Sequence, residues 1–316
     1  MRGSKGSCMK TFYRLLLLAL INTGLMVLHS GCSPQEETGT RHAFVSILPH
    51  RSIAQRVAGD RFAIHVLVGP GQSPHSYTPT PGQIVKLSES RLFFRAGVEF
   101  EEGILPKINK TMPDLTVVDL RKDIPLREME CDHGRHHHDH DEHGHNDSEV
   151  HHHNGGTDPH IWLSPVLMKT QAATIKDVFV EADPEGKGVY ETNLKALHAD
   201  LDSLNSFLHE TLDPISGTEL FVFHPSFGYF ADEYGFHQQA IEIAGKEPSA
   251  KTLAHLIDQA REHQPKVIFV QPQFSQKSAR AIAEQVECAV VPINPLPEDY
   301  LKEMREMGEK INAALE

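Results

Sequence analysis

Apolar residues follow two alternating patterns from about residue 42 to the end of the chain. Short apolar runs, typical of strands buried on both faces of a sheet, alternate with stretches in which apolar residues recur every three or four positions, as on helices that cover a sheet. The runs that predict strands are residues 43–48, 62–68, 91–96, 115–120, 220–223, 238–243, 266–270 and 289–293. This alternation predicts an α/β fold of mainly parallel sheets flanked by helices.

A long helical pattern divides the chain. Ser164 and Pro165 provide a cap and a first-turn proline for a helix that extends to about residue 182. Beyond it, one apolar stripe on a long helix is formed by Leu194, Leu197, Leu201, Leu204 and Leu208. We therefore predict two lobes joined by a long rigid helix, with a ligand site in the cleft between them. The predicted boundaries are 42–182 for the first lobe, 183–213 for the linking helix and 214–316 for the second lobe.

The first residues read as a secretory leader. Basic residues precede an apolar stretch at 15–28, and a polar segment follows Cys32. The sequence before Cys32 resembles a bacterial lipobox, in which the cysteine becomes lipidated. We predict a signal peptide over 1–31, a tether over 32–41 and an extracytoplasmic protein, in the periplasm or at the cell surface, anchored to the membrane through Cys32. Ordinary cleavage, which would leave a soluble protein, is the alternative.

Composition narrows the range of partners. The chain has 316 residues and a formal net charge of −13, so nucleic acid and anionic membrane surfaces are unfavourable partners, whereas a cation is a favourable one. Of the four cysteines, Cys131 and Cys288 lie beyond the leader, and the sequence leaves open whether they pair. Nothing in the sequence indicates an obligate oligomer, so we expect a monomer.

A histidine-rich segment over residues 132–156 has almost no apolar residues and cannot form a core. We predict a disordered loop of the first lobe that attracts metal, because neutral imidazole is a ligand for zinc, copper and nickel. A solvated loop without a metal role is the alternative. Its histidines are His133, His136, His137, His138, His140, His143, His145, His151, His152 and His153.

Three further histidines share a different context. His75, His160 and His224 each lie beside a proline, in a loop that follows a strand or precedes a helix. Open α/β sheets bind ligands at the carboxyl ends of their strands, so a ligand between the lobes could contact all three. Three imidazoles with a water molecule or a carboxylate form a tetrahedral site of the kind that binds zinc.

The motifs around these histidines identify a family. Residues 73–81, 158–165, 224–230, 245–249 and 267–274 resemble motifs of the metal-specific solute-binding proteins of bacterial ABC transporters, and of their zinc-uptake branch in particular. The resemblance covers essentially the whole mature chain. It implies two α/β lobes joined by a rigid helix, and a permease, with its ATPase, as partner.

The same resemblance implies that His75, His160 and His224 bind the metal. The manganese branch usually carries glutamate at the position of His224, so histidine there, like the histidine-rich insertion, implies zinc. Asn294 stands where the family commonly has an aspartate, and Ser73 where an aspartate often precedes the Pro-His pair. The fourth ligand therefore stays open. A water molecule, a loop histidine and three side chains are candidates, either as the ligand or as support behind it: Asn294, Glu242 and His50.

The function we expect is extracytoplasmic capture of Zn²⁺ and its delivery to an ABC-transporter permease. A surface-anchored zinc buffer or adhesin of the same fold, and a manganese-binding relative, are alternatives. A secreted metalloenzyme is disfavoured, because His209-Glu210 is not followed by the second histidine of a zincin motif and no phosphate loop or nucleophile elbow is present. We therefore expect no enzymatic activity.

Overall fold

The structure is a computed structural model that describes residues 41–129, 156–241, 250–274 and 276–316. The expected signal peptide, Cys32, Glu242 and the ten histidines of the histidine-rich segment lie outside the described residues. Within the described ranges no helix is both long and apolar enough to cross a membrane.

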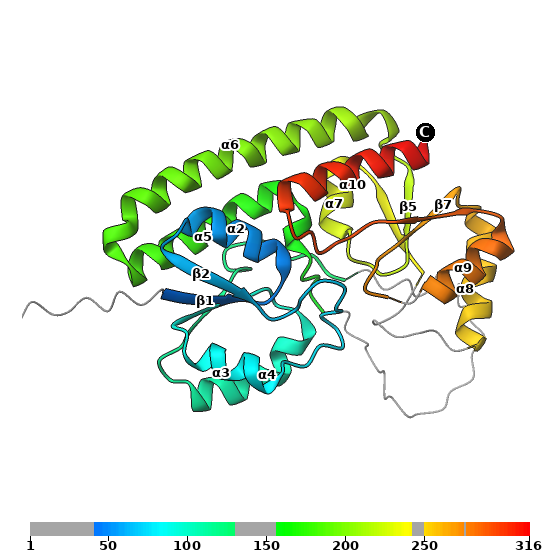
Figure 1. Cartoon of the computed structure of the whole chain (residues 1–316). Coiled ribbons are helices and arrows are strands. Elements are labelled where there is room, and N and C mark those ends of the chain that lie inside the picture. Colours follow the sequence, from blue (N-terminus) through cyan, green and yellow to red (C-terminus); the bar gives the residue numbers. More distant parts are fainter. Residues whose placement is uncertain (1–40, 130–155, 242–249, 275) are drawn as a thin grey trace, which may run out of the picture. The chain divides into compact units, whose positions relative to one another are not determined.

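The first lobe is built on a four-stranded parallel sheet with the strand order β2-β1-β3-β4. Its strands are β1 (Arg41–Val45), β2 (Phe62–Val66), β3 (Leu92–Arg95) and β4 (Thr116–Asp119). Helices α2 (Leu48–Ala58), α3 (Pro81–Ser88) and α4 (Glu99–Thr111) connect them (Figure 1). Parallel strands need such crossovers, and helices on both faces explain why these strands are nearly continuous in apolar residues.

The second lobe repeats this winding with the order β6-β5-β7-β8, again fully parallel. Its strands are β5 (Glu219–Val222), β6 (His237–Ala240), β7 (Val267–Val270) and β8 (Ala289–Pro292). The helices of this lobe are α7 (Gly228–Tyr234), α8 (Ala250–His263) and α9 (Gln276–Val286). In each sheet the successive strands are added in opposite directions on the two sides of the first strand, β1 or β5. The carboxyl ends of the strands at this point are where α/β sheets hold ligands.

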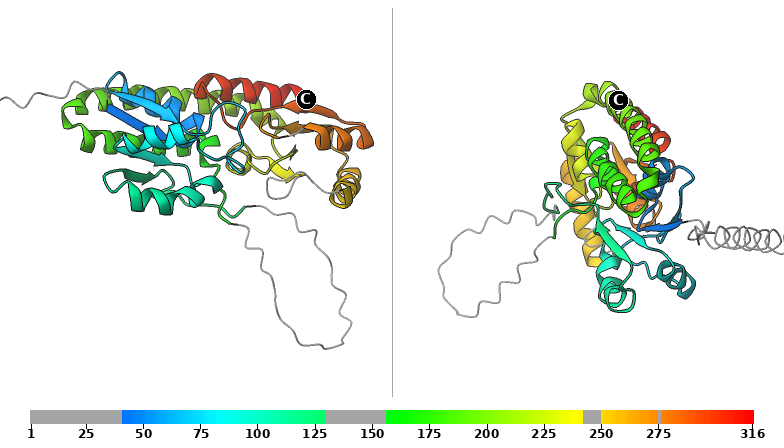
Figure 2. Two further views of the ribbon diagram at one scale, coloured as in Figure 1. Left: turned by 60° about the horizontal axis from the view of Figure 1, so that its bottom comes forward. Right: turned by 90° about the vertical axis from the view of Figure 1, so that its left-hand side faces the viewer.

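A layer of long helices runs along both lobes (Figures 1 and 2). It consists of α5 (Pro165–Ala182), α6 (Lys187–Leu212) and α10 (Tyr300–Leu315). Helix α6 packs against α2 and α5 of the first lobe, against α7 of the second, and along α10. The predicted leucine stripe faces this packing, since Leu197, Leu201, Leu204 and Leu208 are buried. At 26 residues, α6 is about 39 Å long, enough to span both lobes.

The start of α6 is fixed by a buried carboxylate. Asp183 accepts hydrogen bonds from Arg61, the residue before β2, and from the hydroxyl of Tyr190 in α6. The hydrogen bond from Arg61 lowers the pKa of Asp183 to about 2. The linking helix therefore joins the first lobe through an ion pair as well as through apolar packing.

The final helix begins later than the sequence suggested. In the sequence, Pro297 predicts the start of this helix, but α10 begins at Tyr300 and Asp299 is its cap, accepting from the backbone N–H of Lys302. The Glu303 carboxylate accepts from the backbone N–H groups of Glu298 and Asp299, which holds residues before the helix in a turn. Aspartate is a preferred cap, whereas the apolar Leu296 before Pro297 is not, which explains the later start.

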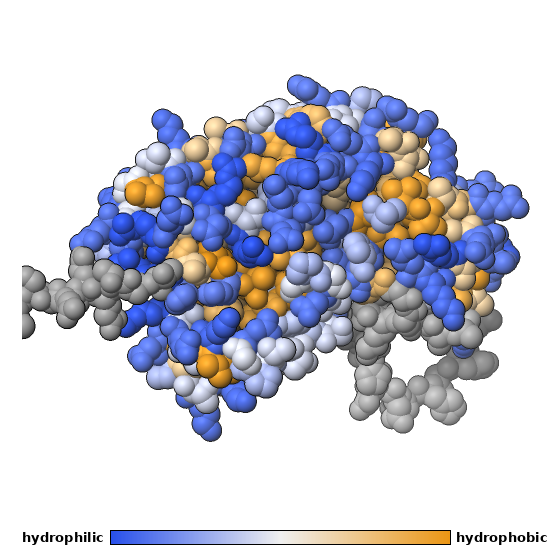
Figure 3. All heavy atoms as spheres, viewed as in Figure 1, coloured by the Kyte–Doolittle hydropathy of each residue, from blue (hydrophilic) through white to orange (hydrophobic). Residues whose placement is uncertain are grey.

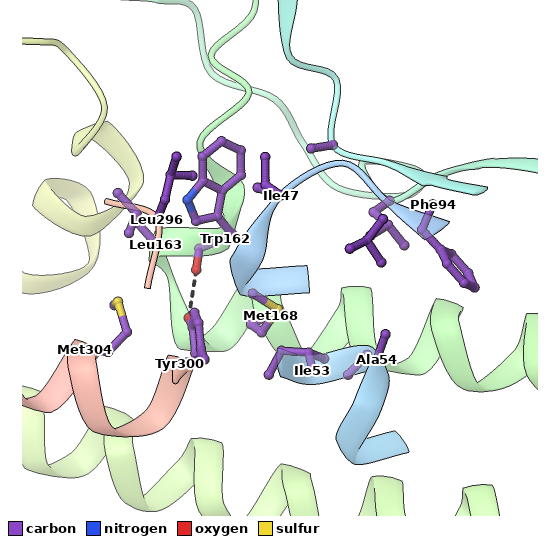
Figure 4. Packing of buried hydrophobic residues seen from close by; sticks show 14 of the residues in the cluster. Ile47, Ile53, Ala54, Phe94, Trp162, Leu163, Met168, Leu296, Tyr300 and Met304 are labelled. Carbon is purple, nitrogen blue, oxygen red and sulfur yellow. Dashed lines mark hydrogen bonds between the residues drawn. The ribbon is translucent and has the colours of Figure 1, made fainter. Parts of the chain in front are cut away.

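Trp162 joins the lobes within the main apolar core (Figure 4). Its indole Nε1 donates to the carbonyl of Pro295 (2.7 Å), and its own carbonyl accepts from the Tyr300 hydroxyl (2.7 Å). Leu163 and Leu296 pack nearby and are buried. On the face shown in Figure 3, polar side chains surround smaller apolar areas, as expected for a protein whose core is interior.

Candidate metal centre

Three histidine side chains from separate parts of the chain converge between the lobes. Each of His75, His160 and His224 offers a ring nitrogen, and these three atoms lie within 4.8 Å of one another. Nε2 of His75 lies 2.9 Å from Nε2 of His224. Nitrogen ligands around tetrahedral zinc are about 3.3 Å apart, given Zn–N bonds of about 2.0–2.1 Å, so the group fits a small divalent cation after slight adjustment.

His160 is held at both its backbone and its ring. It precedes the 3₁₀ turn Ile161–Leu163 and is buried. The Oδ1 atom of Asp158 accepts from the His160 backbone N–H (2.9 Å) and lies 2.7 Å from its Nδ1. A carboxylate on Nδ1 fixes the tautomer that leaves Nε2 for the metal and makes the ring a better ligand.

His75 lies in the loop between β2 and α3. Its backbone N–H donates to the Ser73 hydroxyl (3.3 Å), so the residue two before the histidine supports it as Asp158 supports His160. Its Nδ1 lies 3.3 Å from the Glu99 carboxylate, which is mostly exposed. Farther along, the Tyr77 hydroxyl donates to the carbonyl of Leu67 (2.6 Å), which holds the loop against the end of β2.

His224 follows β5 and is held by its backbone. The buried side chain of Gln271, at the end of β7, accepts from the His224 N–H (3.0 Å) and donates to the His224 carbonyl (3.1 Å). The Phe274 ring lies against the imidazole, with centroids 4.8 Å apart. Two neighbouring strand ends therefore position this histidine, as the sheet topology requires.

Apolar side chains surround the three histidines. The pocket they share is lined by Pro74, Val98, Trp162, Phe274 and Leu296, besides Ser226, Gln273 and Pro295. Such walls exclude water and strengthen the interaction of a cation with its ligands. The backbone just before Val98 is held by Glu101, a buried carboxylate that accepts from the N–H groups of Ala96 (2.7 Å) and Gly97 (2.8 Å). Burial raises the pKa of Glu101.

A family model described as zinc-uptake complex component A, periplasmic (ZnuA) matches residues 44–314. The chain belongs to this family. The high-affinity zinc uptake system protein ZnuA of Bacillus subtilis is 32% identical over 273 residues, which cover 84% of this chain and 82% of that protein.

Solved structures of the ZnuA family share the fold. A crystal structure of ZnuA aligns with a TM-score of 0.76 and 34% identity over 88% of this chain and 100% of that one. A crystal structure of a ZnuA deletion mutant with zinc bound gives a TM-score of 0.75 and 35% identity over 88% and 98% of the two chains. The two parallel-sheet lobes and the long helix predicted from the sequence are thereby confirmed.

Two of the three candidates for a fourth ligand make hydrogen bonds to other residues. Oδ1 of Asn294 accepts from Gln273 (2.7 Å) and from the Leu296 N–H (3.1 Å), so this amide supports the pocket wall. His50 is fully buried and its Nε2 lies 2.7 Å from Gln171. Oδ1 of Asn294 and Nε2 of His50 thus take part in hydrogen bonds to protein groups, and Glu242 lies outside the described residues.

Several supporting residues were not assigned a role from the sequence. Asp158 and Gln271 lie within recognised motifs, but their contacts depend on how the chain folds back. Glu99 lies 24 residues from His75 and outside every motif. Its position just after β3, at the carboxyl end of the sheet, is the feature that could have identified Glu99 as a residue of the site.

Proposed function

We propose that this protein captures Zn²⁺ outside the cytoplasm and delivers it to the permease of an ABC transporter. The observation that carries the proposal is the convergence of the His75, His160 and His224 ring nitrogens within 4.8 Å. Membership of the zinc-uptake family supports the same conclusion. We propose that each of these three histidines is a ligand, and that the metal is transported cargo, not a cofactor.

The choice of metal follows from the donor atoms. Imidazole nitrogen suits zinc, whereas manganese favours carboxylate and carbonyl oxygen. Among the described residues, the cluster holds three histidines and no carboxylate, since Asp158 and Glu99 face the Nδ1 atoms on the outer side of the rings. A water molecule would fill the fourth position. We therefore infer specificity for zinc over manganese.

Capture and release follow from the placement of the ligands. His75 and His160 belong to the first lobe and His224 to the second, so a bound ion joins the lobes. The long helix α6 and the Trp162 link restrict the motion that can separate them. A displacement of about 1–2 Å, ordinary for packed helices, would break the site without a wide opening.

The segments outside the described residues complete the proposal. We propose that Cys32 carries the lipid anchor and that the histidines of residues 132–156 bind metal weakly and raise its concentration near the cleft. The domain boundaries proposed from the sequence, at 42–182, 183–213 and 214–316, assign the linking role to α6.

Competition against a zinc chelator tests this function. We compare the mature chain with His224→Ala, with a variant lacking residues 132–156, and with His255→Ala as a control for an exposed histidine on α8. The proposal requires one tight zinc ion in the wild type, the loop deletion and the control, and its loss in His224→Ala. Tight binding that disappears with residues 132–156, or manganese bound as tightly as zinc, would refute it.

A further inference from the structure

The hydroxyl of Tyr229 forms hydrogen bonds to two segments of the other lobe. Tyr229 is the second residue of α7, five residues after His224, and is buried. Its hydroxyl donates to the carbonyl of Asp158 (3.1 Å) and accepts from the backbone N–H of Arg127 (3.0 Å). A phenol is suited to this position because it donates and accepts at one oxygen.

The two partners of Tyr229 are bonded to each other. The Asp158 N–H donates to the Arg127 carbonyl (2.9 Å), so the three residues close a ring of hydrogen bonds. Asp158 is also the residue whose carboxylate holds both the backbone and the Nδ1 of His160. The phenol is therefore one hydrogen bond from the group that orients a proposed ligand.

The Arg127 side chain strengthens the same contact. Its guanidinium lies 5.9 Å from the centre of the Tyr229 ring, 3.9 Å from Asp158 Oδ2 and 3.4 Å from Asp232 Oδ2 on α7. Gly228 leaves room for this arrangement, since a Cβ there would overlap the guanidinium in its present position. The first turn of α7 is thus shaped to fit Arg127 and Asp158.

The Tyr229 ring forms an apolar contact of its own between the lobes. It packs with Ile124 and Ile161 in a small cluster separate from the main core, with Leu126 and Leu167 at the edge. Ile161 adjoins His160. Two residues after this histidine, Trp162 donates to Pro295 of the second lobe, and two residues before it, Asp158 accepts from Tyr229. The segment carrying His160 is therefore tied to the second lobe on both sides.

We propose that Tyr229 is a positioning residue for zinc: its hydroxyl holds the Asp158–His160 segment at a fixed distance from His224 and so slows release of the ion. The proposal rests on the zinc site proposed above. Without the hydroxyl, the Asp158 carbonyl and the Arg127 N–H lose a shared partner, and His160 can move away from His224 while the ring keeps its packing.

The test is Tyr229→Phe, with Tyr234→Phe as the matched control. Tyr234 is a buried tyrosine of the same helix whose hydroxyl donates to Asn205 of α6 (2.8 Å). The measurements, on the intact mature chain, are zinc affinity by chelator competition, zinc dissociation rate by stopped flow, and melting temperature of the metal-free protein. We expect Tyr229→Phe to weaken zinc binding about tenfold, mainly through faster release, as for other changes behind metal ligands.

The control separates positioning from general destabilisation. Tyr234→Phe should lower the melting temperature comparably and leave zinc affinity within twofold of the wild type. Equal affinity losses in the two variants, or wild-type release from Tyr229→Phe, would overturn the proposal. His224→Ala is measured in parallel. If it binds zinc normally, the zinc site itself is wrong and the positioning role falls with it; if it loses zinc while Tyr229→Phe does not change, only the positioning role is wrong.

Discussion

Asp158 accepts hydrogen bonds from both the backbone N–H and the ring of His160, at 2.9 and 2.7 Å. One buried carboxylate thus sets the position and the tautomer of the histidine. Ser73 makes the backbone half of this contact to His75, at 3.3 Å, and Glu99 makes the ring half, also at 3.3 Å. Each histidine of the first lobe is therefore held by one contact to its backbone and one to its ring. Asp158 makes both contacts to His160, whereas Ser73 and Glu99 make one each to His75.

Asp158→Asn is expected to weaken zinc binding by about 10–100-fold, because an amide can no longer attract the proton on Nδ1 as a carboxylate does. Chelator competition measures the effect. Asp232→Asn is the control, since Asp232 also contacts Arg127 but is exposed and touches no proposed ligand. An affinity of Asp158→Asn equal to that of the control would contradict the orienting role.

Acid should destabilise the metal-free protein through His50. Burial lowers the pKa of His50 to about 4, so between pH 6.5 and 4 the unfolded chain binds a proton that the folded chain does not. Stability is therefore lost as the pH falls through this window, by about 2 kcal/mol at pH 5. Urea unfolding at pH 7.5 and 5 measures it, and His50→Gln should show that much less pH dependence. An unchanged pH dependence in the variant would exclude His50 as the source.

Asp183 should contribute to stability but not to zinc binding. Its hydrogen bonds from Arg61 and Tyr190 stabilise the charged form, so Asp183→Asn is expected to cost roughly 2–3 kcal/mol of unfolding free energy at pH 7. Because the pKa is lowered to about 2, this contribution is present above the unfolded value near 4 and is lost as the pH falls through 2. Urea unfolding measures the loss of unfolding free energy. A change in zinc affinity of the same variant would contradict the expectation that Asp183 does not contribute to zinc binding.

Tryptophan fluorescence should report the site directly. Trp162 is the single tryptophan of the chain, and its ring centre lies 5.1 Å from that of His160. Zinc at the cluster changes the charge and the orientation of the imidazole beside the indole. We expect a fluorescence change that saturates at one equivalent of zinc and is absent in His160→Ala. A change that persists in this variant would place the responding zinc elsewhere.

The sequence predicts the fold well where one periodicity dominates. The helix expected from Ser164 and Pro165 to about residue 182 is α5, and the leucine stripe lies on α6 as expected. The start of α10 was wrong because Asp299, followed by Glu303, competes with Pro297 as the helix start. Where two residues both favour a helix start, contacts that cannot be read from the sequence determine which of them begins the helix.

The candidate site, too, could be predicted from the sequence only in part. Strand ends and flanking prolines predicted that His75, His160 and His224 could meet, because parallel sheets bring such positions to one edge. The contacts that support these histidines could not be predicted from the sequence. The Tyr229 hydroxyl meets the Asp158 carbonyl across 71 residues, and His50 turns into the core after Pro49, where either direction was compatible with the sequence. Both depend on side-chain direction and on how the lobes pack.

Binding of zinc by the three histidines is tested by diffraction from zinc-loaded crystals at the zinc absorption edge, using the chain without residues 132–156. We expect one strong anomalous peak about 2.0–2.1 Å from Nε2 of each of His75, His160 and His224. A peak bound elsewhere, or one that contacts fewer than these three nitrogens, would contradict it.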